Sequence, residues 1–211
     1  MVAVSWLARP VVNVAYVITA DADGPASRQE FGRRLLQHLA ATAFGTDRIA
    51  IGAEPSGRPI LLDPPKPAFI SLTHSGQVVA AALARRPVGI DAEQLPRAPH
   101  RPRLVPRVCS PVEIDALDRL APNERDEAFM RIWTRKEAYG KALGVGLDFR
   151  LRTVTVGPQG ARVRGVTGRW VVTDVDLGPD IAAALVIEGR RPNIDIERVD
   201  PALVGLRGHR A

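Results

Sequence analysis

Residues 129–144 read FMRIWTRKEAYGKALG, and this stretch has the spacing of one long helix. At about 100° per residue, one stripe of that helix holds Phe129, Ile132, Trp133, Gly140 and Leu143. Lys136 falls in the middle of the stripe, where an ammonium is unfavourable unless it meets an anion or reaches water. Gly140 in a helix interior costs about 1 kcal/mol relative to alanine, which indicates that another group approaches closely. We therefore expect a helix from about Asn123 to a C-cap at Gly144, with a functional face.

Glu137 and Lys141 lie one helical turn apart, and Glu137 is at the edge of the stripe. A purely structural interpretation is open for both, as an exposed i,i+4 ion pair worth about 0.3–0.5 kcal/mol. In the same interpretation Trp133 belongs to the core and Lys136 extends to solvent. That interpretation accounts well for Trp133 and the ion pair, and less well for a central Lys136 beside Gly140.

About forty residues earlier, the segment Gly89-Ile90-Asp91-Ala92-Glu93 predicts a strand. Because strand side chains alternate, Asp91 and Glu93 share one face and Ile90 and Ala92 share the other. Two carboxylates on one face repel each other unless a cation or water separates them. Magnesium commonly uses one or two carboxylates together with substrate phosphates, and Gly89 would let a ligand approach the backbone. Taken alone, the segment is explained more simply as a solvated strand end.

Before that strand, Ser71-Leu72-Thr73-His74-Ser75-Gly76 predicts a strand end followed by a turn. Such a turn can offer backbone N–H groups, hydroxyls and an imidazole to a phosphate. A Ser/His hydrolase is a weak alternative, because the chain has no Gly-x-Ser-x-Gly elbow. Two basic residues complete the set, Arg58 in a Gly-Arg-Pro turn and Arg28 near the start of the first predicted helix. Each of these arginines, taken alone, is explained more simply as a surface charge.

The first half of the chain, residues 1–93, is predicted to hold one helix and several strands. We expect the helix to have Ser27 as its N-cap and to end near Phe44. Strands are predicted at residues 11–19, 69–73, 77–83 and 88–93. Residues 94–109, rich in proline and arginine, are expected to be a linker, and a basic docking surface is the alternative.

The second half, residues 110–190, is predicted to begin with a capping box at Ser110 and Glu113. A short helix, the long helix described above and three strands follow, the strands at residues 151–156, 168–176 and 181–187. Residues 191–211 are polar and are expected to form a peripheral tail. Each half therefore combines helix and strands, which favours an α+β fold of duplicated architecture.

The composition is that of an ordinary globular protein. Of 211 residues, 45% are hydrophobic and 25% are charged, which excludes a disordered, collagenous or disulfide-scaffold protein as an overall class. The one cysteine, Cys109, has no internal partner and fits a reducing compartment. The apolar stretch from Pro10 to Ala20 is too short to span a bilayer and lacks the basic start of a signal peptide. We expect a cytoplasmic protein.

The net charge of +6 favours anionic partners, such as nucleic acid, a membrane surface, phosphorylated ligands or acidic proteins. Only three of the 29 basic residues are lysines, namely Lys66, Lys136 and Lys141. Two of the three fall on the long helix, five residues apart, which distinguishes them in an arginine-rich chain.

In this order, the motifs resemble the 4′-phosphopantetheinyl transferases of the surfactin type. The family's most specific marks are a Gly-x-Asp-x-Glu strand and a later Trp-x-x-Lys-Glu-x-x-x-Lys helix. They correspond here to residues 89–93 and 133–141, preceded by the histidine turn. The resemblance implies two similar α+β halves, related by a pseudo-twofold axis, with the active site at their interface. It also implies transfer of the phosphopantetheine arm of coenzyme A to a serine of an acyl or peptidyl carrier protein, which releases adenosine 3′,5′-bisphosphate.

By matching position, the resemblance also implies roles for single residues. Asp91, Glu93 and Glu137 would hold Mg²⁺ against the pyrophosphate of coenzyme A, and Glu137 would be the base for the carrier serine, directly or through a water. Lys141 would stabilise the phosphate charge. The other implied contacts to coenzyme A come from His74, Arg58, Arg28, Thr73, Ser75 and Lys136. The implied partner is an acidic carrier protein, without nucleic acid or membrane, and the implied state is a monomer.

The chain departs from the family pattern without losing an expected metal ligand. Thr73 stands where serine is usual and keeps the hydroxyl, and Arg58 stands where lysine is common and keeps the charge. Gly140 and Ala92 are smaller than the usual residues. Two alternatives stay open, a basic module that binds nucleic acid and an inactive relative that binds coenzyme A without transfer.

Overall fold

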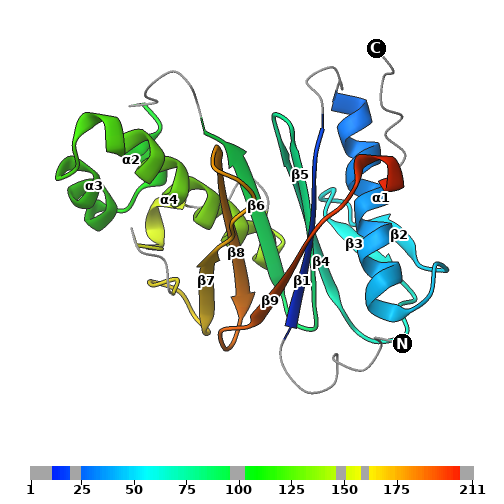
Figure 1. Cartoon of the computed structure of the whole chain (residues 1–211). Helices are drawn as coiled ribbons and strands as arrows, with labels where there is room; N and C mark the ends of the chain where they lie inside the picture. The colour runs from blue at the N-terminus through cyan, green and yellow to red at the C-terminus, as the bar shows by residue number, and fades with distance from the viewer. Residues whose placement is uncertain (1–10, 20–24, 96–102, 146–150, 158–161, 205–211) are drawn as a thin grey trace, which may run out of the picture.

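The computed structural model describes residues 11–19, 25–95, 103–145, 151–157 and 162–204 (Figure 1). Its helices are α1 (Pro25–Phe44), α2 (Val105–Val108), α3 (Pro111–Asp118) and α4 (Pro122–Leu143), with short 3-10 turns η2 (Leu151–Thr153) and η3 (Pro201–Val204). Its strands are β1 (Val11–Ile18), β2 (Ala50–Ala53), β3 (Pro59–Leu62), β4 (Phe69–Ser75), β5 (Val78–Ala84), β6 (Val88–Gln94), β7 (Trp170–Asp174), β8 (Ile181–Glu188) and β9 (Asn193–Arg198). The predicted α+β class is confirmed.

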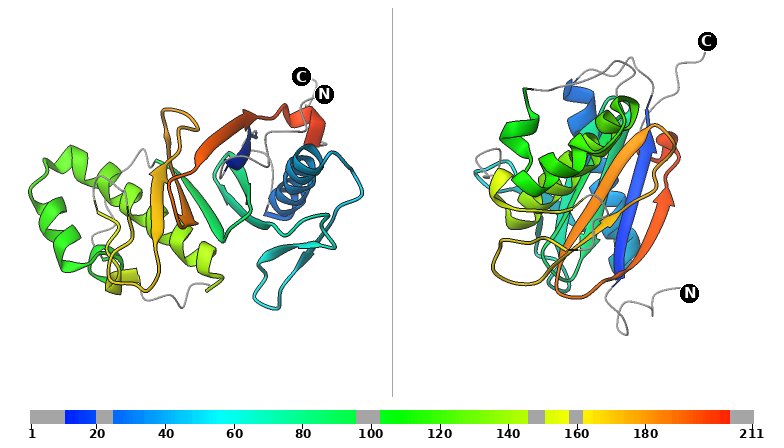
Figure 2. Two further views of the ribbon diagram at one scale, coloured as in Figure 1. Left: turned by 90° about the horizontal axis from the view of Figure 1, so that it is seen from below. Right: turned by 90° about the vertical axis from the view of Figure 1, so that its left-hand side faces the viewer.

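The strands form two main sheets that pack face to face. One sheet has the order β4-β5-β1-β9 and the other the order β6-β8-β7, while β2 and β3 form a separate hairpin. Helix α1 covers the outer face of the first sheet and α4 covers the outer face of the second (Figures 1 and 2). The layers therefore run helix, sheet, sheet, helix, with a hydrophobic cluster at each of the three boundaries.

The central boundary explains the composition of β5. All seven residues of β5 are buried, because α1 covers one face of this strand and the second sheet covers the other. Its sequence, VVAAALA, is correspondingly apolar on both faces and mostly small. A run of this kind is typical of a strand that is covered on both faces.

The chain crosses between the two sheets in both directions. Strand β6 comes from the first half of the chain but pairs with β8 in the second sheet. Strand β9 comes after β8 and returns to the first sheet, where it pairs in parallel with β1 from Val11↔Asn193 to Tyr16↔Arg198. The prediction of a peripheral tail from residue 191 is therefore wrong for β9, and also for the buried Val199.

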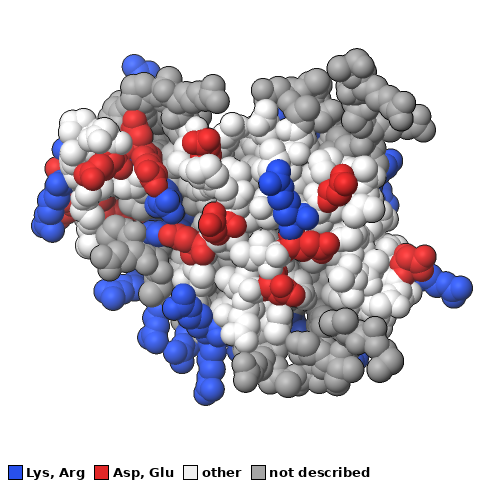
Figure 3. Space-filling view, viewed as in Figure 1, with Lys and Arg blue, Asp and Glu red and all other residues white. Residues whose placement is uncertain are grey.

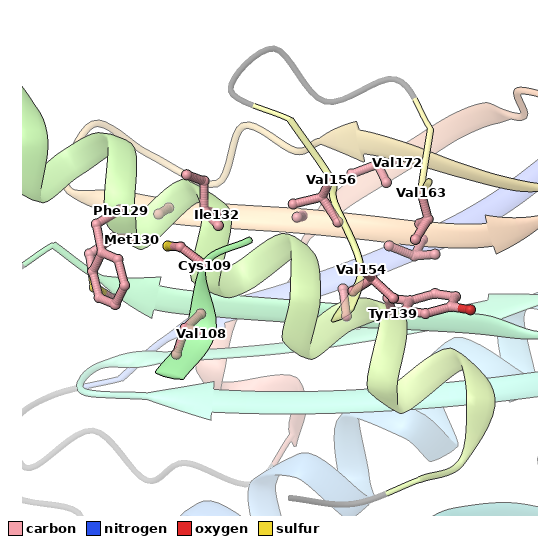
Figure 4. Packing of buried hydrophobic residues seen from close by; sticks show 14 of the residues in the cluster. Val108, Cys109, Phe129, Met130, Ile132, Tyr139, Val154, Val156, Val163 and Val172 are labelled. Atoms are coloured by element: carbon pink, nitrogen blue, oxygen red, sulfur yellow. The ribbon is translucent and has the colours of Figure 1, made fainter. Parts of the chain in front are cut away.

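Two further predictions need correction. The expected linker at residues 94–109 ends in helix α2, and both Val108 and Cys109 are buried beside α4 (Figure 4). Residues 151–156, expected as a strand, begin with the turn η2, and Thr155 makes only an isolated bridge to Arg164.

Helix boundaries follow the capping signals in two of three cases. Helix α3 begins after Ser110, whose backbone N–H donates to the Glu113 carboxylate at 2.8 Å. Helix α4 ends at Gly144, which has a φ of 72°. Helix α1 begins at Pro25, so Ser27 lies inside it and is not its N-cap. None of the helices in the described part of the chain is both long and apolar enough to span a lipid bilayer.

Candidate active site

The candidate site lies where α4 packs directly on β6. A Cβ atom at Gly89 would come within 1.9 Å of the Ala138 carbonyl oxygen and 2.6 Å of the Ala142 nitrogen. Only glycine permits this approach without movement of one backbone or the other. Gly89 therefore sets the distance between the strand that carries Asp91 and the helix that carries Glu137. The sequence predicted that Gly89 leaves room for a ligand, but helix α4 occupies that space.

Side chains on β6 alternate as the sequence predicted. Ile90 and Ala92 are fully buried in the cluster between the two sheets, and Asp91 and Glu93 lie on the other face. Asp91 is 4% exposed, and its Oδ1 atom lies 2.7 Å from Lys141 Nζ on α4. The predicted strand and helix motifs are thus in direct contact, through an ion pair between them.

Glu137 joins this group electrostatically. Burial raises the pKa of Glu137 above its usual value, and the negative charge of Asp91 raises it further. Lys141 acts in the opposite direction, and Glu93 adds a smaller repulsion. The three carboxylates are therefore close enough to oppose one another's ionisation, which is the situation that a divalent cation relieves.

Glu93 shows the same effect. Its pKa is raised above the usual value mainly by burial, while a hydrogen bond from Ser75 lowers it and the Asp91 charge raises it again. A carboxyl with a raised pKa close to charged partners is typical of functional sites.

A row of hydroxyls on β4 faces these carboxylates. Thr73 Oγ1 donates to Asp91 Oδ1 at 2.9 Å, and Ser75 Oγ donates to Glu93 Oε2. Ser71, two residues before Thr73, accepts the Ile90 N–H at 3.1 Å. We call Ser71, Thr73 and Ser75 the hydroxyl row. Sequence reasoning missed Ser71, although its i, i+2 spacing to the other two was visible.

His74 lies apart from the hydroxyl row. Because His74 belongs to strand β4 and not to a turn, its side chain points to the opposite face from Thr73 and Ser75, and it is exposed. Arg28 donates to the Gly76 carbonyl at 3.3 Å, at the end of the same strand. The expected turn is therefore displaced to Gly76 and Gln77.

Arg58 and Lys141 share a pocket of about 220 Å³. The pocket lies between the β2–β3 hairpin, β4 and the end of α4, and its other lining residues include Leu72, Gly144 and Val145. Two cationic side chains above a largely apolar wall suit a ligand with a phosphate and an apolar part. The structure thus brings Arg58 to Lys141, as a joint phosphate-binding role requires.

Lys136 does not lie at the site surface. It is fully buried, and its ammonium is 2.6 Å from Glu113 Oε2 and 2.7–2.8 Å from the carbonyl oxygens of Val108, Leu151 and Val154. Burial lowers the pKa of Lys136, and the Glu113 carboxylate opposes that change. The expected contact of Lys136 with coenzyme A is wrong in this structure, because every N–H of the ammonium already has an acceptor within the fold.

Positive charge also gathers away from this site. Arg162 and Arg164 are exposed and flank Val163, which is buried in the cluster around α4. Figure 3 shows Lys and Arg side chains grouped below β7 with no acidic side chain among them.

The donor set fits a divalent cation in kind. Asp91 Oδ2 is buried and has no hydrogen-bond partner in the described part of the chain, although a buried carboxylate oxygen normally has one. Carboxylates are the ligands that Mg²⁺ prefers. Among the described residues, however, no three Asp, Glu, His or Cys side chains converge as a ready metal site. Movement of Glu93 or Glu137 toward Asp91 would be needed for the three carboxylates to bind one ion.

The arrangement between β6, α4 and β4 is a candidate site for a cation and a phosphorylated ligand, because it combines carboxylates with a lysine and with the pocket that Arg58 lines. Comparison with known proteins agrees with this class. Residues 87–184 match the model of the 4′-phosphopantetheinyl transferase superfamily, a segment that contains β6 and α4. Residues 87–184 are thus similar to that superfamily, and the resemblance predicted from the motifs is confirmed.

Individual relatives have the same family name. A 4′-phosphopantetheinyl transferase of Bacillus subtilis is 31% identical over 133 residues, which are 62% of this chain and 58% of the relative. The transferase psf-1 of Bacillus pumilus is 33% identical, over 62% of this chain and 55% of its own. The transferase AcpT of Escherichia coli K12 is 38% identical, over 54% of this chain and 55% of its own. The matches thus span little more than half of each relative.

Proposed function

We propose that this protein transfers the 4′-phosphopantetheine arm of coenzyme A to a serine of an acyl or peptidyl carrier protein. The observation that carries the proposal is the contact between the two motifs, where Lys141 of α4 binds Asp91 of β6 and Glu137 lies within electrostatic reach of both. The superfamily match over residues 87–184 supports it.

In the proposed reaction, the serine oxygen bonds to the phosphorus that carries pantetheine. The P–O bond to the other phosphate of the pyrophosphate breaks, and adenosine 3′,5′-bisphosphate leaves. Glu137 takes the serine proton, directly or through a water, and the burial that raises its pKa makes it a stronger base. Lys141 and Arg58 bind the phosphates from the pocket that they share.

Asp91, Glu93 and Glu137 would hold Mg²⁺, which, when bound, would neutralise charge on the pyrophosphate. The unpartnered Asp91 Oδ2 supports this assignment. The proposal keeps the expectation of two pseudo-twofold halves with coenzyme A between them, and of a cytoplasmic monomer. The roles of His74 and Arg28 at the phosphates remain part of it.

The decisive experiment is the intact mass of a purified apo carrier protein after incubation with this protein, coenzyme A and Mg²⁺. We expect the mass of one phosphopantetheine arm to be added, and no addition with EDTA. If several carriers gain no mass and coenzyme A does not bind, the proposal fails, and salt-dependent binding of DNA becomes the next test of the basic surface.

Two variants of α4 sharpen the experiment. Glu137→Gln should lower the transfer rate by about 10²-fold or more, because it removes both a ligand and the base. Glu127→Gln is its matched control, since Glu127 is exposed on the same helix and pairs only with Arg131 among the described residues. Full activity of Glu137→Gln would remove Glu137 from both roles.

A further inference from the structure

The hydroxyl row joins two sheet edges that have no backbone pairing with each other. Strand β4 is the last strand of the first sheet and β6 is the last strand of the second. Between them, Ser71 Oγ accepts the Ile90 N–H at 3.1 Å and Thr73 Oγ1 accepts the Ala92 N–H at 3.3 Å. The hydroxyls thus satisfy buried N–H groups of β6 that would otherwise lack a partner.

Thr73 and Ser75 also act on the carboxylates, whereas Ser71 does not. Thr73 Oγ1 donates to Asp91 Oδ1 and Ser75 Oγ donates to Glu93 Oε2. Each β4 hydroxyl thus faces one position of β6, and two of the three use their proton on a candidate metal ligand. A hydroxyl has one proton, so the proton that Thr73 gives to Asp91 is not available to a phosphate.

The hydrogen bonds of Asp91 are unequal. Its Oδ1 atom accepts from both Thr73 and Lys141, while Oδ2 is buried and has no partner within the described residues. Asp91 is 4% exposed, so water compensates little for this. Two donors on one oxygen fix the rotation of the carboxylate and leave the other oxygen available.

From this geometry we propose that Thr73 is a positioning residue for the metal site. It holds Asp91 Oδ1 so that Oδ2 is presented to a divalent cation, and Ser75 donates a hydrogen bond to the neighbouring Glu93 carboxylate. This inference rests on the proposed function, and it assigns Thr73 and Ser75 to the carboxylates and not to coenzyme A. Groups that orient metal ligands typically contribute 10–100-fold to metal affinity.

The test measures Mn²⁺ affinity, by electron paramagnetic resonance or calorimetry, without coenzyme A or carrier. Thr73→Val removes the hydroxyl at nearly constant shape and should weaken Mn²⁺ binding by about tenfold or more. Thr73→Ser should restore it. Ser71→Ala is the matched control, because it also removes an acceptor for one β6 N–H but no hydrogen bond to a carboxylate. Its Mn²⁺ affinity should stay within about twofold of the wild type.

A second measurement is independent of metal and of transfer. In EDTA, the losses in the free energy of unfolding caused by Thr73→Val and Asp91→Ala should be non-additive in the double variant, as measured in urea. The losses caused by Ser71→Ala and Asp91→Ala should add.

If Thr73→Val leaves Mn²⁺ affinity unchanged and raises the KM for coenzyme A, the inference is overturned in favour of a phosphate contact. Absence of Mn²⁺ binding by the wild type also overturns it. If Thr73→Val loses Mn²⁺ affinity and the wild type shows no transfer, the inference is supported although the proposed function fails.

Discussion

At the scale of single residues, Lys136 and Glu113 form the most completely buried ion pair among the described residues. Both side chains are 0% exposed, and Glu113 also accepts the N–H groups of Ser110 and Val156 at 2.8 Å. Lys136 therefore connects α4 to the start of α3 and to the segment after η2. A buried charge is tolerable only with such a complete set of partners.

Replacing Lys136 should destabilise the fold strongly. Lys136→Met leaves the Glu113 carboxylate buried without its cation, and we expect a loss of about 3–5 kcal/mol in the free energy of unfolding, measured in urea. Lys66→Met, at an exposed site, should change it by less than about 0.5 kcal/mol. Equal stability of the two variants, with a raised KM for coenzyme A in Lys136→Met, would restore the phosphate contact that the sequence suggested.

The carboxylates of the site predict how stability depends on pH. Because the folded pKa values of Glu93 and Glu137 are raised above 4.5, the folded protein holds more protons than the unfolded chain between 4.5 and the raised values. Their contribution to stability is therefore greatest at low pH and is lost as the pH rises through that window.

We expect this contribution to be visible in thermal unfolding without metal. Glu137→Gln cannot ionise, so its Tm should exceed that of the wild type above the window and approach it toward about pH 4.5. Addition of Mg²⁺ should raise the Tm of the wild type more than that of the variant. A Tm difference that does not change with pH would show that the repulsion around Glu137 is negligible.

Local rules predicted some of these residues and not others. Strand alternation placed Asp91 and Glu93 together, and helical spacing placed Glu137 one turn from Lys141, because both patterns are local. Lys136 was misassigned because its partners are Glu113 and residues 108, 151 and 154, which no periodicity connects to α4.

The thiol of Cys109 has a pKa raised to about 12, mainly by burial, so it is an unreactive core group.

At the scale of elements, the contact between β6 and α4 depends on Gly89. The Cβ of an alanine there would overlap the backbone of Ala138 and Ala142, and neither atom belongs to a flexible side chain. Movement of α4 away from β6 would carry Glu137 and Lys141 away from Asp91.

We expect Gly89→Ala to lower the free energy of unfolding by about 1–3 kcal/mol, as overpacking in a core does. It should also lower transfer and Mn²⁺ affinity together, because it changes the spacing of the ligands. Gly52→Ala is the matched control in a strand, since its Cβ would meet only the Leu62 side chain, at 3.0 Å. An unchanged Mn²⁺ affinity in Gly89→Ala would argue against a spacing role for Gly89.

The elements differ in how far sequence could predict them. Helix α3 begins after its capping box at Ser110 and α4 ends at its C-cap Gly144, so these two boundaries were predicted from local signals. Residues 151–156 have the β-branched composition of a strand, but they supply carbonyl groups to Lys136 and begin with a 3-10 turn. Tertiary contacts overrode the local preference there.

At the scale of the whole molecule, the two sheets are linked by the path of the chain. Strand β6 leaves the first half to join the second sheet, and β9 leaves the second half to join the first. The parallel pairing of β9 with β1 connects residues about 180 positions apart, and the polar sequence of β9 shows no sign of it. Because no local pattern signals this pairing, a tail was predicted where the structure has a strand.

This path predicts that the two sheets unfold together. Val199, after β9, is 2% exposed in the cluster between α1 and the first sheet, whereas Trp133 and Trp170 pack in the cluster around α4. In a Trp6→Phe background, tryptophan fluorescence then reports only the α4 side.

Val199→Asp buries a charge on the opposite side, and we expect the fluorescence Tm to fall by about 6–12 °C, which corresponds to about 3 kcal/mol. Ile196→Asp, at a side chain that is 41% exposed, should shift it by less than about 2 °C. If Val199→Asp lowered the far-UV circular dichroism transition but left the fluorescence transition in place, the sheets would be independent units, and the crossing strands would not couple them.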